Sequence, residues 1–224
     1  MTAQQAPENL KQRLKESYDA IAPKYNKWTI PKSEQRLHYL DKLLDCLNVT
    51  ESPHRSVLEL GCGCGVPVTQ RLLQHDGFRV VANDLSGVQI KEARQNLGPV
   101  PAERLELVEG DMFELSFPEG SLDAVIGLYS LIHLPCSEQD AMIKKIASWL
   151  KPGGYMLANF SEEATSGVVY EEWLDPKGWV YWSGHGAEGT VTKVREAGLE
   201  IVVSEVAKDA VNASFMWIIG RKPN

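Results

Sequence analysis

Five short apolar runs, separated by segments of helical periodicity, constrain the fold of this chain more than any other feature. The runs cover residues 56–61, 78–84, 104–110, 122–128 and 154–160, and the first and third of them end at glycine. The segments between them carry apolar residues at helical spacing. Strands that alternate with crossover helices form a parallel sheet covered by helices. The pattern therefore predicts an α/β fold built on a mainly parallel sheet.

Capping residues mark where the helices between these runs begin and end. Ser86 and Gln89 form a capping-box pattern in front of an apolar stripe. Pro67 falls where the first turn of a helix accepts proline. Ser137 is expected to cap a further helix, which stops at the Lys-Pro-Gly sequence of residues 151–153.

The N-terminal region has the apolar spacing of two helices. Residues 8–28 present one apolar face, and Pro23 is expected to break or kink this helix near Ala22. A second helix is expected from Ser33, with leucines on one face as far as Leu47. We expect both helices to pack on the sheet as a cap.

The C-terminal third is less regular up to a predicted helix at 190–197. Two strands are predicted after it, at 199–206 and 214–220. Residues 208–213 between them are too few for a crossover helix, so these strands should pair antiparallel. With no repeat or linker in the chain, we predict one domain over residues 1–224, with cap helices in 1–50, the core in 51–224 and an irregular aromatic insert at about 161–189.

Composition excludes several classes of protein. The 224 residues include 23 Lys and Arg against 30 Asp and Glu, a net charge of −7, without any basic run longer than two residues. Nucleic acid is therefore not an expected partner. No apolar stretch approaches the roughly 20 residues of a membrane span, and the N-terminus has no apolar signal core, so we expect a cytoplasmic protein. The four cysteines have neither disulfide-framework nor zinc-site spacing, so no metal is expected.

A glycine-rich loop follows the first predicted strand directly and leads into a helix. Gly61, Gly63 and Gly65 alternate along it, and glycine there lets a ligand approach the backbone N–H groups. A dinucleotide-binding fingerprint needs its third glycine at position 66, where Val66 stands. The pattern is instead acid-x-Gly-x-Gly-x-Gly, beginning at Glu59.

Two further carboxylates lie at the carboxyl ends of the next strands. Asp84 ends the second run and can accept hydrogen bonds from a ribose diol, while Asp111 follows the third run. Ligands bind at this edge of open parallel sheets. An ordinary turn residue is the alternative interpretation of each.

With these motifs, residues 18–220 resemble a class I S-adenosylmethionine-dependent methyltransferase of the small-molecule branch, similar to quinone-biosynthesis enzymes of methyltransferase type 11. The resemblance implies a Rossmann-like, mainly parallel seven-stranded sheet with an antiparallel last strand and N-terminal cap helices. It also implies S-adenosylmethionine as cofactor. The cofactor-binding residues implied are Tyr18, Tyr25, Glu59, Gly61, Gly63, Asp84, Leu85, Asp111, Met112 and Leu128.

A methyl donor with a sulfonium leaving group needs mainly positioning of the acceptor, an O, N or S atom of a small-molecule metabolite. If the acceptor is a hydroxyl, a base helps, and His133 and His185 are the candidates. A packed histidine is an equally good interpretation of His133, and a solvent-exposed loop residue is the better one of His185. We assign His133, Trp28 and Trp182 to the substrate side.

Aromatic residues concentrate in the predicted insert, at Tyr170, Trp173, Trp179, Tyr181 and Trp182. They suit a pocket for a flat or apolar metabolite, although covering the sheet explains some of them equally well. A nicotinamide-dependent oxidoreductase and a non-catalytic S-adenosylmethionine-binding module are the alternative functions. The acceptor and the oligomeric state stay open.

Overall fold

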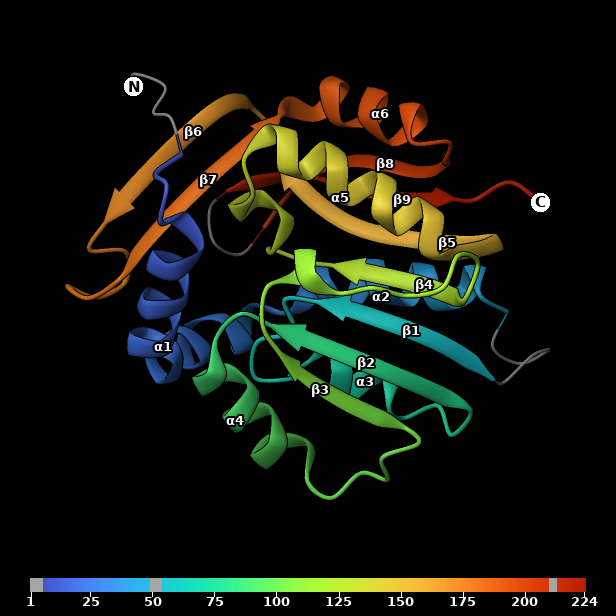
Figure 1. Cartoon of the computed structure of the whole chain (residues 1–224), viewed down its shortest axis with the longest axis horizontal. Coiled ribbons are helices and arrows are strands. Elements are labelled where there is room, and N and C mark those ends of the chain that lie inside the picture. The colour runs from blue at the N-terminus through green and yellow to red at the C-terminus, as the bar shows by residue number, and fades with distance from the viewer. Residues whose placement is uncertain (1–5, 49–53, 210–212) are drawn as a thin grey trace.

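The computed structural model describes residues 6–48, 54–209 and 213–224 and contains a seven-stranded sheet (Figure 1). The order of its strands is β3-β2-β1-β4-β5-β9-β8. Their bounds are β1 Arg55–Leu60, β2 Phe78–Asp84, β3 Leu105–Glu109, β4 Leu122–Gly127, β5 Leu150–Ser161, β8 Glu200–Lys208 and β9 Ser214–Arg221. The expected cap region and the β8–β9 connection extend over residues 1–5, 49, 50 and 210–212, which lie outside the described residues.

The pairing within the sheet confirms the predicted topology. Strands β1 to β5 are mutually parallel where they pair, with Leu58 opposite Val81 and Val125. The last strand, β9, lies antiparallel between β5 and β8, and Ile218 faces Ala158 on one side. Strands β8 and β9 therefore pair antiparallel, as expected.

Helices cover both faces of the sheet. Their bounds are α1 Leu10–Thr29, α2 Glu34–Cys46, α3 Val68–Leu72, α4 Gly87–Leu97, α5 Cys136–Trp149 and α6 Gly186–Glu196, with 3-10 turns η1 Ile30–Lys32, η2 Met112–Glu114 and η3 Leu131–His133. Side chains of α5 and α6, including Met142 and Val194, form the core on one face. Side chains of α2, α3 and α4 form the core on the other, where Tyr39 stacks on the fully buried Trp217 at 4.3 Å.

The predicted capping residues behave differently from one another. Ser86 caps α4, because its hydroxyl accepts a hydrogen bond from the Gln89 backbone N–H at 3.1 Å. The prediction for Ser137 is wrong: α5 begins at Cys136, two residues earlier than expected, with Pro135 at the N-cap position and no side-chain cap. Proline already fits a helix entrance, so the serine hydroxyl is not needed there. The predicted start of α6 at 190 is also wrong, since the helix begins at Gly186.

The prediction that Pro23 breaks the first helix is wrong as well. Helix α1 runs continuously through Pro23, which is exposed. Loss of one backbone hydrogen bond is outweighed by the tertiary contacts of the helix, which buries Leu10 and Leu14 against Trp179.

The predicted irregular insert is in fact a β-hairpin, formed by β6 (Ala164–Glu171) and β7 (Trp179–His185). It forms because β-branched and aromatic residues favour strands. Alternation along β7 buries Trp179 and Tyr181 beneath α1 and directs Trp182 to the other face. The hairpin and α1 lie together at the end of the sheet to which the parallel strands point (Figure 1).

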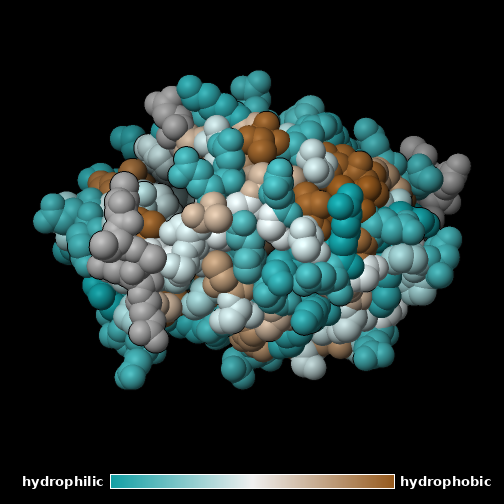
Figure 2. Space-filling model, turned by 90° about the horizontal axis from the view of Figure 1, so that it is seen from above, coloured by the Kyte–Doolittle hydropathy of each residue, from teal (hydrophilic) through white to brown (hydrophobic). Residues whose placement is uncertain are grey.

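The surface is mainly hydrophilic on the face seen in Figure 2, with separate hydrophobic patches. Among the described residues, the exposed large hydrophobic side chains are Tyr170, Val202 and Val206. The helices that can be described are too short or too polar to span a membrane.

Candidate active site

A first cavity lies under α1, at the carboxyl ends of β1, β2 and β4. Its lining unites the predicted cofactor residues other than Glu59, namely Tyr18, Tyr25, Gly61, Gly63, Asp84, Leu85, Asp111, Met112 and Leu128. The carboxyl ends of neighbouring parallel strands meet at one edge of the sheet, which explains why residues distant in sequence converge here.

The glycine loop forms the floor of this cavity. The backbone N–H groups of Gly61 and Cys62 both donate to the Asn83 carbonyl, at 2.8 Å. Gly61 has a φ of +77°, and a Cβ at this position would lie 2.4 Å from the Cβ of Ser130. Only glycine therefore fits at position 61.

Asp84 is held rigidly by the backbone around it. Its two carboxylate oxygens accept hydrogen bonds from the N–H groups of Gly63, at 2.7 Å, and Ser86, at 2.9 Å. Burial raises the pKa of Asp84 to about 6, although both hydrogen bonds act in the opposite direction. At neutral pH the site therefore presents a charged acceptor with its orientation already set.

Glu59 lies beneath the loop and outside the linings of both cavities described here. Its carboxylate accepts a hydrogen bond from the Thr69 hydroxyl at 2.5 Å, which ties the end of β1 to α3. Burial raises the pKa of Glu59 to about 7. Its position supports the loop that carries Gly61 and Gly63.

Helix α1 closes the first cavity through ion pairs. Lys11 Nζ lies 2.7 Å from Asp111 and 3.2 Å from Glu138, and Lys15 lies 3.0 Å from Glu109. The space left beneath the helix is about 100 Å³. Sequence reasoning missed Lys11, because one lysine on the polar face of a helix gives no signal of a cavity.

A second cavity of about 400 Å³ adjoins the first one. Tyr18, Tyr25, Tyr129 and His133 line both cavities and form their common wall. The predicted substrate-side residues Trp28 and Trp182 also line the second cavity, so the structure brings His133 together with both.

His133 is partly buried in the common wall, with both ring nitrogens engaged. Nδ1 lies 2.9 Å from the Tyr181 carbonyl oxygen, which can only accept, so Nδ1 carries the proton. Nε2 is therefore an acceptor and receives the Tyr18 hydroxyl at 2.9 Å. Burial lowers the pKa of His133 to about 4, so the ring is neutral at pH 7. His185 lies elsewhere, 2.7 Å from Asp140.

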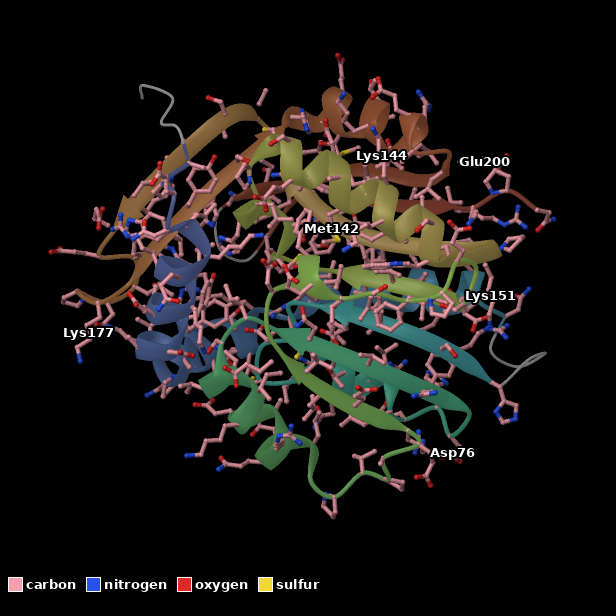
Figure 3. All side chains as sticks on the ribbon, viewed as in Figure 1. Asp76, Met142, Lys144, Lys151, Lys177 and Glu200 are labelled. Atoms are coloured by element: carbon pink, nitrogen blue, oxygen red, sulfur yellow. The ribbon has the colours of Figure 1, made fainter. Side chains whose placement is uncertain are left out.

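Trp173 is the centre of the aromatic wall of the second cavity. Its ring centroid lies 5.7 to 6.0 Å from those of Tyr25, Trp28, Tyr18 and Trp182. It belongs to the turn between β6 and β7, which Figure 3 places beside α1, near the label of Lys177. An ion pair of 3.1 Å between Lys24 and Asp175 joins this turn to α1.

Tyr129 and Arg36 are wall residues that sequence reasoning missed. Tyr129 has a left-handed backbone, with a φ of +57°, and its N–H donates to Asn159 Oδ1 at 2.6 Å. Its hydroxyl donates to the Asp209 carboxylate. Arg36 lies on α2, between residues of an apolar stripe, where the periodicity gave no reason to expect a cavity.

Comparison with known proteins agrees with this geometry. Residues 57–154, from β1 into β5, match a family model described as a methyltransferase domain. A sterol 24-C-methyltransferase of Gibberella zeae is 30% identical over 48% of this chain, and a 2-methyl-6-phytyl-1,4-hydroquinone methyltransferase of Synechocystis is 30% identical over 57%. The chain spans 28% and 42% of the length of these two relatives.

A solved structure extends the likeness to the whole fold. The 1,6-didemethyltoxoflavin-N1-methyltransferase of Burkholderia thailandensis, solved with S-adenosylhomocysteine, has a TM-score of 0.73 at 19% identity and covers 100% of this chain and 93% of its own. The fold is that of a Rossmann-like α/β methyltransferase. Residues 57–154 therefore match a methyltransferase domain, and the chain as a whole is similar in fold to this enzyme.

Proposed function

We propose that this chain binds S-adenosylmethionine in the first cavity and transfers its methyl group to a small molecule in the second. The observation that carries the proposal is the His133–Tyr18 pair in the wall common to both cavities. A neutral imidazole with an accepting Nε2 favours a hydroxyl oxygen over N or S as the acceptor atom, because a neutral amine can attack before it loses a proton and a thiol ionises more readily than a hydroxyl.

The chemistry of the first cavity fits this cofactor. Asp84 offers a charged acceptor for ribose hydroxyls, Gly63 leaves space beside the backbone, and Asp111 lies where an adenine amino group would find an acceptor. When bound, S-adenosylmethionine supplies a methyl group on a cationic sulfonium.

Entry of a ligand of this size requires α1 to move outward, since about 100 Å³ is less than the roughly 300 Å³ or more of ordinary ligand pockets. The ion pairs of Lys11 and Lys15 are partly exposed, and such pairs contribute about 0 to 1 kcal/mol each. Opening the helix therefore breaks weak contacts, and Lys11 leaves Asp111 free for the ligand.

His133 would act as the base on the acceptor side. An acceptor hydroxyl that takes the place of the Tyr18 hydroxyl at Nε2 donates its proton there, while the Tyr181 carbonyl keeps Nδ1–H oriented. The low pKa of His133 keeps the ring unprotonated before the reaction. Protonation becomes more favourable as the neighbouring positive charge disappears on methyl transfer.

The names of the relatives support methyl transfer to a small molecule, since they include sterol and hydroquinone methyltransferases. Val66 in place of a third dinucleotide glycine weighs against the oxidoreductase alternative. A measurement of methyl-transfer turnover distinguishes the enzyme from the non-catalytic S-adenosylmethionine-binding module, which would show none.

The test is incubation with methyl-labelled S-adenosylmethionine and a small-molecule extract of the source cells, followed by mass spectrometry. We expect a labelled product with the wild type and at least a tenfold lower yield with His133→Gln. S-adenosylmethionine binding without any labelled product, over extracts from several growth conditions, would favour the non-catalytic module.

A further inference from the structure

Arg36 is a buried cation in the wall of the second cavity. It belongs to α2 and is 8% exposed. Its Nη2 donates to the carbonyl and hydroxyl oxygens of Thr29, at 2.5 and 3.0 Å. Its Nε is buried and has no hydrogen-bond partner among the described residues.

The guanidinium of Arg36 lacks a carboxylate partner within ion-pair distance in the described part of the chain. A buried charge is costly unless it is paired, because burial removes its hydration. Guanidinium also presents a planar fork of donors that matches a carboxylate. An anion from outside the chain would complete the environment of this side chain.

The other charges of the cavity are arranged on two sides. Lys32 lies near Arg36 in sequence, at the end of η1, with its Nζ 4.1 Å from the Trp28 ring centroid. On the acidic side, Asp209 already accepts the Tyr129 hydroxyl. Glu162 and Glu163 also line the cavity, but both are exposed, so solvent screens them.

The Arg36 guanidinium carbon lies 5.5 Å from the Tyr129 ring centroid, and the hydroxyl of the same ring donates to Asp209. An anionic group would be attracted by Lys32 and Arg36 and repelled by Asp209. The rings of Trp28 and Trp173 form part of the wall of the second cavity, and aromatic rings favour a flat ligand.

We propose that the acceptor is a flat hydroxylated aromatic carboxylic acid, whose carboxylate binds to Arg36 while its hydroxyl reaches His133. This inference rests on the proposed function, because it describes the acceptor of the same reaction. Arg36 is then a specificity-determining residue, and its contact with Thr29 orients the guanidinium.

The test compares acids with their neutral isosteres. Binding of 3-hydroxybenzoate, 4-hydroxybenzoate and 4-hydroxycinnamate, and of the three corresponding carboxamides, is measured by ligand-observed NMR with and without S-adenosylhomocysteine. We expect the wild type to bind at least one acid roughly ten- to a hundredfold more tightly than its amide, the usual effect of a hydrogen bond to a charged group. Arg36→Gln should abolish this preference, and Arg36→Lys should retain part of it.

Arg13→Gln is the matched control, since Arg13 lies on α1 outside both cavity linings, with its guanidinium carbon 4.1 Å from the Trp179 ring centroid. It should keep the full preference for acids. If Arg36→Gln does not fold, the inference is tested by the ratio of acid to amide affinity in the wild type and by the same ratio in Arg36→Lys. Equal binding of acid and amide by the wild type, no binding of any acid, or a preference that survives in Arg36→Gln would overturn the inference.

Failure of the proposed function would look different. It would appear as absent S-adenosylhomocysteine binding, or as absent methyl transfer, measured in the wild type independently of the acids. Loss of the acid preference alone, with S-adenosylhomocysteine affinity unchanged in Arg36→Gln, identifies the acceptor-side role.

Discussion

Asp84→Asn removes the charged acceptor of the first cavity while keeping its shape. The carboxylate accepts from the backbone N–H groups of Gly63 and Ser86, whereas an asparagine amide can accept only on one side. The ribose hydroxyls of the ligand also lose a charged acceptor. Such hydrogen bonds contribute roughly 1.5 to 3 kcal/mol, so the Kd should rise about ten- to 150-fold.

The pKa of Asp84 gives this prediction a pH dependence. The ligand needs the carboxylate form, so the bound state has a lower Asp84 pKa than the free protein, in which it is about 6. As pH falls below 6, binding must first displace a proton, and wild-type affinity should fall by up to about tenfold per pH unit. Asp84→Asn has no carboxyl group to titrate and should show a smaller change.

Calorimetric titration with S-adenosylhomocysteine at pH 7.5 and pH 5.0 measures both effects. Asp76→Asn is the matched control, because Asp76 is fully exposed near the opposite end of the sheet (Figure 3). It should behave like the wild type at both pH values. A folded Asp84→Asn variant with wild-type Kd at pH 7.5 would refute the reasoning, and a wild-type Kd equal at both pH values would refute the pH argument.

Three further substitutions test other parts of the site. Gly63→Val should abolish S-adenosylhomocysteine binding in calorimetry, because Gly63 has a φ of +54° that a β-branched residue does not adopt. The control variant Gly98→Ala, at a φ of +66° with open space around it, should bind normally. Binding by Gly63→Val would contradict the assignment of the glycine loop to the cofactor site. Trp182→Ala should raise the KM for the acceptor roughly tenfold without changing cofactor affinity, and equal loss of both would indicate a packing role. Tyr18→Phe should leave kcat and cofactor Kd nearly unchanged, because the acceptor displaces the Tyr18 hydroxyl from His133 Nε2 before the reaction, and a tenfold or greater loss of kcat would contradict that displacement.

The sheet and the cofactor side of the site could be predicted from the sequence because both depend on local patterns. Apolar runs that end at Gly61, at Asp84 and just before Asp111 predict strand ends, and neighbouring parallel strands necessarily bring their ends together. The wall between the cavities was harder to predict from the sequence. His133 and Trp182 were named, but the contact of His133 with Tyr18 joins residues 115 positions apart.

The β6–β7 hairpin shows where local reasoning failed although a signal existed. Residues 179–182, Trp-Val-Tyr-Trp, have strong strand propensity, and the Asp-Pro-Lys-Gly sequence at 175–178 is typical of a turn. The concentration of aromatic residues suggested a pocket instead. Arg36 and Tyr129 had no such signal, because their role follows only from what α2 and β4 pack against.

The central claim is that the first cavity is an S-adenosylmethionine site, and calorimetry with S-adenosylhomocysteine and NAD⁺ on the wild-type protein tests it without knowledge of the acceptor. The glycine pattern from Glu59 to Gly65, with Val66 after it, predicts saturable binding of S-adenosylhomocysteine and none of NAD⁺. Saturable NAD⁺ binding, with S-adenosylhomocysteine bound weakly or not at all, would contradict the account.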